Sequence, residues 1–206
     1  MTNALKITNR KAEKVAVVIA GAGAAGIAIA KLLKAYGVTQ IEMVDSQGIV
    51  DCSRSELPSS KKEFCSSRSG GLAHALKGVD VFIGVSKPNI LTPSMIQSMN
   101  TNPIIFALSN PDPEIIPDLA QKAGAKIIAT GRSDFPNQIN NVLVFPGLFR
   151  GLLDAQIYQI TMEMKLAVAQ TLVELVGSDL STEHIIPKAL NPDVAPAIAA
   201  SIKKFA

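Results

Sequence analysis

Short, wholly apolar runs alternate with helical patterns over the first 150 residues. The runs are rich in Val and Ile and lack polar alternation, which predicts strands buried on both faces of a parallel sheet. The predicted strands are 15–19, 40–44, 80–86, 103–109, 125–130 and a short one at 142–145. Helices are predicted between them, at 27–36, at 72–77, from Thr92 onward and at 114–123. This alternation is typical of a doubly wound α/β fold with a mainly parallel sheet.

The pattern changes after residue 150, where only helical spacing remains. Apolar residues recur at the spacing of a packed helix from Met162 to Val176, and 195–204 predicts a last helix. We therefore expect one domain over 1–206. It would have a core at about 12–150 and a helical C-terminal extension at about 151–206. The polar segment 46–71 is predicted as a long connecting loop that can include a short helix.

A glycine pattern joins the first predicted strand to the first helix, in the sequence KVAVVIAGAGAAG. In a Rossmann-like dinucleotide turn, Gly21 makes the tight turn and Gly23 lets the backbone approach a pyrophosphate. Gly26 then lets the helix pack closely on the strand, and the helix N-terminus faces the phosphates. The alternative is a buried βαβ unit whose glycines serve packing alone.

An acid closes the next predicted strand. Asp45 stands where dinucleotide folds hold the adenosine ribose hydroxyls. Its carboxylate would repel a 2′-phosphate, and Ser46 and Gln47 follow it in place of Arg or Lys, so NAD is predicted in preference to NADP. Three cations of the following loop could swing toward the site, namely Arg54, Lys61 and Lys62.

Polar residues follow the other predicted strands, at the edge where such sheets bind ligands. Asn110 and the pair Asn140–Asn141 stand out, because buried amides there can donate to a substrate carboxylate or to a nicotinamide carboxamide. The alternative is a local structural role, because Asn and Asp side chains also close turns and cap helices. From the residues alone both interpretations stay open.

No residue of the chain stands out as a catalytic acid or base. Its two histidines, His74 and His184, lie in no motif, and no pattern of metal ligands occurs. Asp134 either takes part in catalysis or orders its own loop.

Composition narrows the class of protein. Hydrophobic residues make up 48% of the chain, Trp is absent and the net charge is only +3, which argues against disorder and against an aromatic nucleic-acid platform. The longest apolar run, 15–30, is shorter than the ~20 residues of a membrane span. We expect no signal peptide, and we expect Cys52 and Cys65 to be free thiols in a reducing, cytoplasmic compartment.

Beyond the glycine turn, the chain contains several longer characteristic segments: GAGAAGIAIAKLL, DVFIGVS, PIIFALSNPDPE, ATGRSDFPNQINNVLVFPGLFRG and EHIIPKALNPDVAPAIAASI. Together they resemble the cofactor-binding, C-terminal domain of malic enzymes, in particular the short bacterial and archaeal form. The resemblance starts near Asn3 and runs to the C-terminus.

The resemblance implies a set of ligand-binding residues. The glycines with Ala24 and Ala25 would hold the pyrophosphate, and Asp45 the adenosine ribose. Val85, Ser86 and Leu108 would line the cofactor cleft. Asn110, Asn140 and Asn141 would reach nicotinamide and malate.

Malic enzymes oxidise malate and decarboxylate it to pyruvate with NAD or NADP and Mg²⁺ or Mn²⁺. The family's tyrosine acid, lysine base and metal-binding carboxylates lie N-terminal to the segment that matches Asn3. The resemblance thus implies a domain that binds NAD but is inactive alone and associates with itself. The alternative is a non-catalytic NAD-binding module that serves in regulation or redox sensing.

Overall fold

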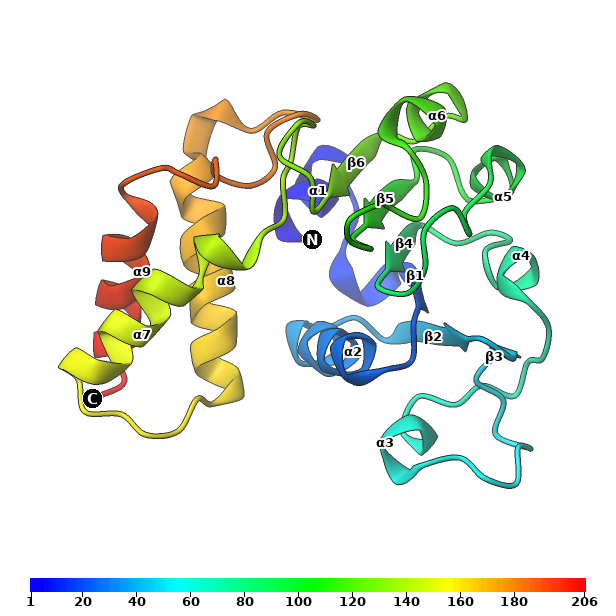
Figure 1. Ribbon diagram of the computed structural model, residues 1–206, viewed down its shortest axis with the longest axis horizontal. Coiled ribbons are helices and arrows are strands. Elements are labelled where there is room, and N and C mark those ends of the chain that lie inside the picture. The colour runs from blue at the N-terminus through cyan, green and yellow to red at the C-terminus, as the bar shows by residue number, and fades with distance from the viewer.

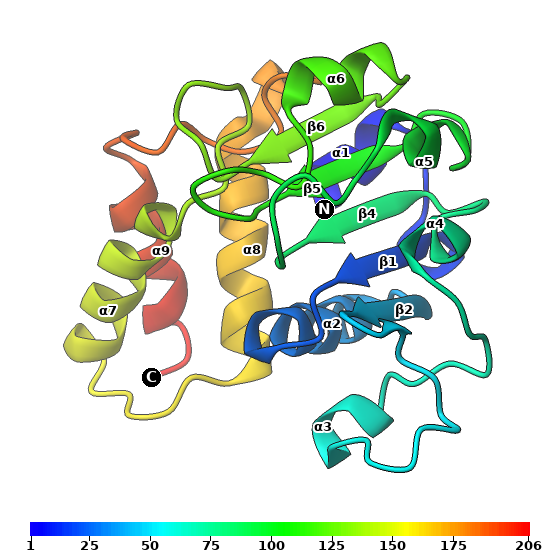
Figure 2. The same cartoon turned by 45° about the vertical axis from the view of Figure 1, so that its right-hand side comes forward.

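The computed structural model describes all 206 residues, from Met1 to Ala206, and its centre is a six-stranded sheet (Figures 1 and 2). The strand order is β3-β2-β1-β4-β5-β6. All neighbouring pairs are parallel except β2 and β3, which are antiparallel. The strands are β1 (Ala16–Ala20), β2 (Gln40–Asp45), β3 (Gly48–Ile49), β4 (Val81–Gly84), β5 (Ile104–Ala107) and β6 (Ile127–Thr130). The predicted mainly parallel α/β sheet is therefore confirmed.

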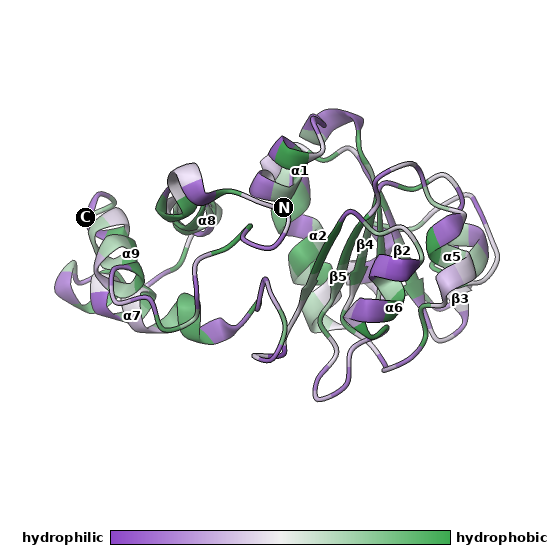
Figure 3. Ribbon diagram, turned by 90° about the horizontal axis from the view of Figure 1, so that it is seen from above, coloured by the Kyte–Doolittle hydropathy of each residue, from purple (hydrophilic) through white to green (hydrophobic).

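Helices cover both faces of the sheet (Figure 3). Neighbouring residues of β1 point to opposite faces and lie in two separate cores. Val17 belongs to the same core as Leu33 of α2, whereas Val18 belongs to the same core as Ile96 of α5. The first face carries α1 (Thr2–Ile7) and α2 (Ala24–Tyr36). The second carries α4 (Leu72–Ala75), α5 (Pro93–Gln97) and α6 (Pro117–Lys122). Burial on both sides explains why the strands are apolar throughout.

Three C-terminal helices form a smaller core beside α2 (Figure 1). They are α7 (Phe145–Asp154), α8 (Met162–Val176) and α9 (Val194–Lys203). Gly147 and Gly151 let α7 lie close against α9, since a Cβ added at Gly147 would lie 2.5 Å from the carbonyl oxygen of Ala195. No helix combines the length and apolar character of a membrane span.

The helical region begins earlier than the sequence predicts. Residues 142–145 are not a strand, because the 3₁₀ turn η2 (Asn141–Leu143) leads directly into α7. Pro146 lies in the first turn of α7, where its missing N–H costs no hydrogen bond and its fixed φ favours the start of a helix.

Other boundaries also differ from the prediction. α6 starts at Pro117 rather than at residue 114. Segment 46–71 contains the short helix that the sequence allowed, α3 (Ser59–Lys62), and also the strand β3, which the prediction missed. The remaining 3₁₀ turns are η1 (Ala12–Lys14) and η3 (Gly177–Asp179).

Two buried asparagines attach the C-terminal segment to the rest of the fold. The Asn3 amide donates to the Ile185 carbonyl at 3.0 Å, and the Ile185 N–H donates to the Asn137 Oδ1 at 2.8 Å. The Asn137 amide also donates to the carbonyls of Ile128 and Thr182. One backbone unit, Ile185, thus joins the N-terminal helix to the edge of the sheet.

Gly26 is where α2 meets β1 most closely, and this contact predicts the effect of a single methyl group. A Cβ at Gly26 would lie 1.8 Å from the Gly21 carbonyl oxygen, whereas a Cβ at Gly23 has no atom within 4 Å. We expect Gly26→Ala to lower the free energy of unfolding by about 2–3 kcal/mol, because backbone must move. Gly23→Ala is the matched control and should lower it by less than about 1 kcal/mol. Urea unfolding followed by circular dichroism measures both, and equal stability of the two variants would contradict the prediction.

Candidate functional site

A cleft of about 770 Å³ opens beyond the carboxyl ends of β1, β2 and β4. Connections from β1 and β4 leave on opposite faces of the sheet, and crevices at such points are where open α/β sheets bind ligands. The cleft lining includes five of the residues predicted from the sequence: Gly21, Gly23, Asp45, Val85 and Ser86.

The glycine turn shapes one wall of the cleft. Gly21 has a φ of +118° and donates its N–H to the Val44 carbonyl at 2.8 Å. A Cβ on Gly21 would lie 2.6 Å from the Val85 carbonyl oxygen, so a side chain is excluded there. Gly23 is the N-cap of α2, and no side chain caps this helix end. Ala24 and Ala25 are exposed in its first turn, so the free amides of α2 are available to an anion.

Asp45 ends β2 on the opposite side of the cleft and is already bound by several donors. Oδ1 accepts from the Gln47 N–H at 3.0 Å, and Arg54 Nη1 lies 3.0 Å from both carboxylate oxygens. Lys61 Nζ lies 3.0 Å from Oδ2. Burial alone would raise the pKa of Asp45, but the hydrogen bonds from Lys61, Arg54 and Gln47 lower it below the usual value. Asp45 is therefore a charged carboxylate at the centre of a cationic pair.

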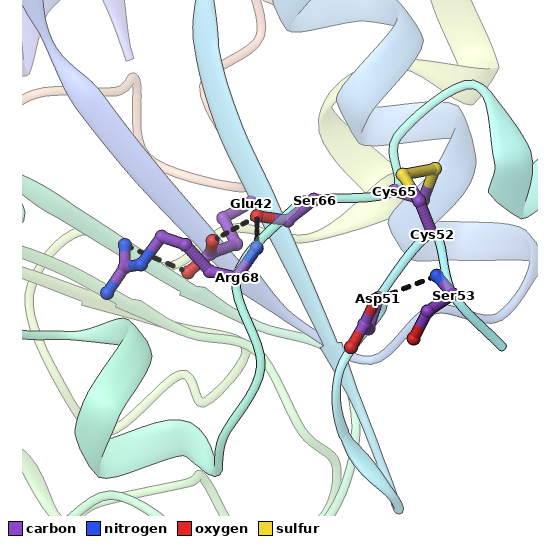
Figure 4. The surroundings of a disulfide bond; sticks show 7 residues. All are labelled: Glu42, Asp51, Cys52, Ser53, Cys65, Ser66 and Arg68. Carbon is purple, nitrogen blue, oxygen red and sulfur yellow. Dashed lines mark hydrogen bonds and ion pairs between the residues drawn. A yellow bond between two sulfur atoms is a disulfide. The ribbon is translucent and has the colours of Figure 1, made fainter.

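The segment that carries Arg54 and Lys61 is closed by a disulfide between Cys52 and Cys65 (Figure 4). The expectation of free thiols is therefore wrong. The two residues lie 13 positions apart, but a backbone ladder brings them together. Cys52 N–H donates to the Ser66 carbonyl at 2.9 Å, and Ser66 N–H donates to the Val50 carbonyl at 2.8 Å. This pairing is set by tertiary structure and has no signature in the cysteine spacing.

A buried glutamate, which sequence reasoning missed, holds two strand ends together. Glu114 has no exposed surface, and its Oε1 accepts from the Ser86 N–H at 3.1 Å while its Oε2 accepts from the Ser109 N–H at 3.0 Å. Gly84 makes room for it, because a Cβ there would lie 2.2 Å from the Glu114 carboxyl carbon. Glu114 thus fixes the backbone that follows β4, next to the cleft. Nothing in a single sequence marks this acid as buried.

The three predicted asparagines lie outside the cleft, as does Leu108. Asn110, Asn140 and Asn141 are all exposed, so the expectation of buried amides is wrong. Asn140 caps η2, because its Oδ1 accepts from the Val142 N–H at 3.0 Å. The structure does not bring these side chains together with the dinucleotide cleft.

Neither histidine lines the cleft, and Asp134 is paired with Arg132. Hydrogen bonds from Arg132, whose Nη2 lies 2.7 Å from Asp134 Oδ2, hold the pKa of Asp134 below its usual value. Arg132 also lies 3.7 Å from Asp112, so these charges order the loops beyond β5 and β6. No group of three His, Cys, Asp or Glu side chains is placed to hold a metal ion.

Comparison with known proteins places this geometry in a family. A family model described as "Malic enzyme, NAD binding domain" matches residues 1–206. A bifunctional malic/malolactic enzyme from Bacillus subtilis is 46% identical over 213 residues, covering 100% of this chain and 52% of that protein. An NADP-dependent malic enzyme from Halomonas elongata is 45% identical over 179 residues, covering 85% of this chain and 42% of that protein.

A solved structure shows the same fold. The crystal structure of an NAD-dependent malic enzyme from Thermotoga maritima is 42% identical, with a TM-score of 0.92 over 98% of this chain and 55% of that one. The chain thus spans about half the length of the relatives it matches. With a family match from end to end and a glycine turn at the head of its cleft, the chain belongs to the NAD-binding domain family of malic enzymes.

Proposed function

We propose that this chain is the dinucleotide-binding half of a malic enzyme and that NAD binds in the cleft between the glycine turn and Asp45. The observation that carries the proposal is the open space at Gly23 beside the uncapped N-terminus of α2. A pyrophosphate there would accept hydrogen bonds from the free amides of Ala24, Ala25 and Gly26 and would meet the positive end of the helix dipole. Asp45, across the cleft, would meet the adenosine ribose.

NAD is proposed as the preferred cofactor, because the Asp45 carboxylate is ionised and stands where the ribose would bind. Relatives that use NAD and relatives that use NADP both occur in the family, so the family match alone does not choose between them.

The parent reaction proposed is oxidation and decarboxylation of malate to pyruvate. In this proposal the chain positions the cofactor, while the acid, the base and the ligands of Mg²⁺ or Mn²⁺ come from the remainder of a malic enzyme. Asn110, Asn140 and Asn141 would meet nicotinamide and malate once that remainder covers the exposed loops that carry them.

Calorimetric titration with NAD tests the cofactor site. We expect saturable binding, and we expect Gly23→Ala to weaken the affinity at least about tenfold, because its methyl group occupies the path of the pyrophosphate. Exposed Gly124, at the end of α6 and away from the cleft, offers a control site. Since Gly124 has a φ of +101°, the control substitution is Gly124→Asn, a residue that tolerates this conformation. Unchanged affinity in Gly23→Ala would contradict the proposed pyrophosphate position.

An activity assay tests whether the chain needs the remainder of a malic enzyme for catalysis. The purified chain with malate, NAD and Mn²⁺ or Mg²⁺ should give no NADH above the rate without malate, measured at 340 nm. The same chain, added to a separately produced remainder of a malic enzyme, should restore NADH formation. Malate-dependent NADH formation by the chain alone would contradict the proposal.

We further propose that the chain associates with itself through an apolar patch on and after α7. The patch consists of Val142, Phe145, Phe149, Leu153 and Tyr158. Phe145 and Phe149 stack at 5.6 Å, Leu153 is 78% exposed and Tyr158 is 97% exposed. Apolar side chains gathered in this way are uncommon on monomeric proteins and favour an interface.

Sedimentation across micromolar concentrations tests self-association. We expect the weight-average mass to rise above that of the monomer with concentration. Phe149→Glu should abolish the rise, because it places a charge in the centre of the patch. Leu190→Glu is the control, since Leu190 is 89% exposed but lies in another segment, before α9. A monomer at all concentrations, or equal effects of the two variants, would contradict the proposal.

A further inference from the structure

Two acidic side chains are buried in the fold, at opposite ends of β4. Asp80 precedes the strand, whereas the carboxyl group of Glu114 lies against Gly84, the last residue of the strand. Asp80 has a cationic partner, because its Oδ1 lies 3.3 Å from Arg10 Nε. Glu114 takes part in none of the ion pairs of the chain. Buried carboxylates are normally paired with a cation, so Glu114 is an exception.

The hydrogen bonds of Glu114 are those of an ionised carboxylate. Its Oε1 accepts from the Ser86 N–H at 3.1 Å, and its Oε2 accepts from the Ser109 N–H at 3.0 Å. Neither oxygen donates to an acceptor, as a protonated carboxyl group would. Hydrogen bonds from N–H groups stabilise the charged form but supply no opposite unit charge. A negative charge therefore remains at this end of β4.

This charge lies directly behind the wall of the cleft. Ser86 lines the cleft, and its own N–H is the group that Glu114 binds. Because Glu114 is wholly buried, water and salt screen its charge little. Lys87 also lines the cleft, but its side chain is exposed and its charge is screened by solvent. A ligand that lies against Ser86 therefore meets a negative field.

The strand order indicates which part of a dinucleotide would lie there. The sheet consists of two halves, β1 to β3 and β4 to β6, in the order that places one mononucleotide over each half. In the proposed function the ribose of adenosine lies at Asp45 in the first half, and the pyrophosphate lies at Gly23. The nicotinamide nucleotide then extends over the ends of β4 and β5, where Glu114 joins Ser86 to Ser109.

The nicotinamide ring is the part of the cofactor whose charge depends on its oxidation state. The ring of the oxidised form, NAD⁺, carries one positive charge. Reduction adds a hydride, that is two electrons and one proton, and leaves the ring of NADH neutral. A fixed negative charge beside the ring therefore favours NAD⁺. The remainder of the cofactor is the same in both forms, so its interactions cancel in the ratio of the two affinities.

We propose that Glu114 makes the cleft selective for the oxidised cofactor, because its buried carboxylate supplies the counter-charge for the nicotinamide ring of NAD⁺. The inference rests on the proposed dinucleotide site and adds a preference for one oxidation state to it. Glu114 acts through its charge and from behind the backbone of Ser86, without touching the ring. The cleft thereby holds NAD⁺ and releases NADH, in keeping with the proposed oxidation of malate.

Calorimetric titrations of the full chain with NAD⁺ and with NADH measure this preference as the ratio of two dissociation constants. We expect NAD⁺ to bind at least about fivefold more tightly than NADH. Glu114→Gln removes the charge with little change of shape and should bring the ratio within about twofold of one. Glu114→Asp keeps the charge and should keep a preference of at least about threefold, even if its shorter side chain weakens both affinities.

Asp80→Asn is the matched control, because it removes the other buried carboxylate from the end of β4 that lies away from the cleft. It should change the ratio by less than about twofold, whatever its effect on stability. Circular dichroism shows which variants keep the fold, since the amide of Glu114→Gln can accept from only one of the two N–H groups.

If Glu114→Gln fails to fold, the salt dependence of the unaltered chain decides. Raising NaCl from about 0.05 M to about 0.5 M should change the ratio by less than about twofold, because a buried charge is screened much less than an exposed one. A ratio that falls to one at the higher salt concentration would assign the preference to exposed charges and overturn the inference.

The outcomes separate the two proposals. Equal affinities for NAD⁺ and NADH, or tighter binding of NADH, overturn the inference and leave the dinucleotide site intact. A preference that is unchanged in Glu114→Gln, or lost equally in Glu114→Gln and Glu114→Asp, overturns it as well. Absence of binding by either form overturns the dinucleotide site and the inference with it. A preference that is lost in Glu114→Gln but kept in Glu114→Asp and Asp80→Asn supports both.

Discussion

The contact between Gly26 and the Gly21 carbonyl sets the geometry of everything at the cleft. A Cβ at Gly26 would lie 1.8 Å from that oxygen, so α2 can start this close to β1 only without a side chain. The same approach directs the first amides of α2 beyond the end of β1 and leaves the space around Gly23 open. Stability and binding therefore depend on neighbouring glycines for different reasons. Gly26 is required by packing, whereas packing leaves room for a side chain at Gly23, where the proposed pyrophosphate would lie.

Around that fixed turn, buried polar contacts hold the loops that follow the strands. Glu114 joins the backbone after β4 to the backbone after β5, and Arg54 joins the end of β2 to β3. Glu114 is buried and Arg54 is partly buried, and each has more than one hydrogen-bond partner, which offsets the cost of removing a polar side chain from water. The backbone that borders the cleft is thus held in place by the side chains of Glu114 and Arg54.

Local patterns in the sequence predicted the elements that depend on local physics. The buried strands, the glycine turn and Asp45 at the end of β2 all follow from apolar runs and short spacings. The failures share a different cause. The Cys52–Cys65 pair and the burial of Glu114 are set by contacts between segments that a spacing rule does not compare, whereas the capping by Asn140 is local and was one of the two interpretations that the sequence left open. Pro146 did carry a local signal for a helix start, and the prediction of a strand at 142–145 overlooked it.

The charge at Asp45 shows why a residue type at a motif position does not by itself decide cofactor choice. The carboxylate is the expected residue, but its partners lie 9 and 16 positions further along the chain. Those partners place two cations against the carboxylate, and a disulfide closes the segment that bears them. The charge that a ligand would meet at Asp45 is therefore set by the whole segment 45–65. A change in that segment that moves Arg54 or Lys61 would alter this charge, whereas the glycine turn contacts neither side chain and keeps its own packing.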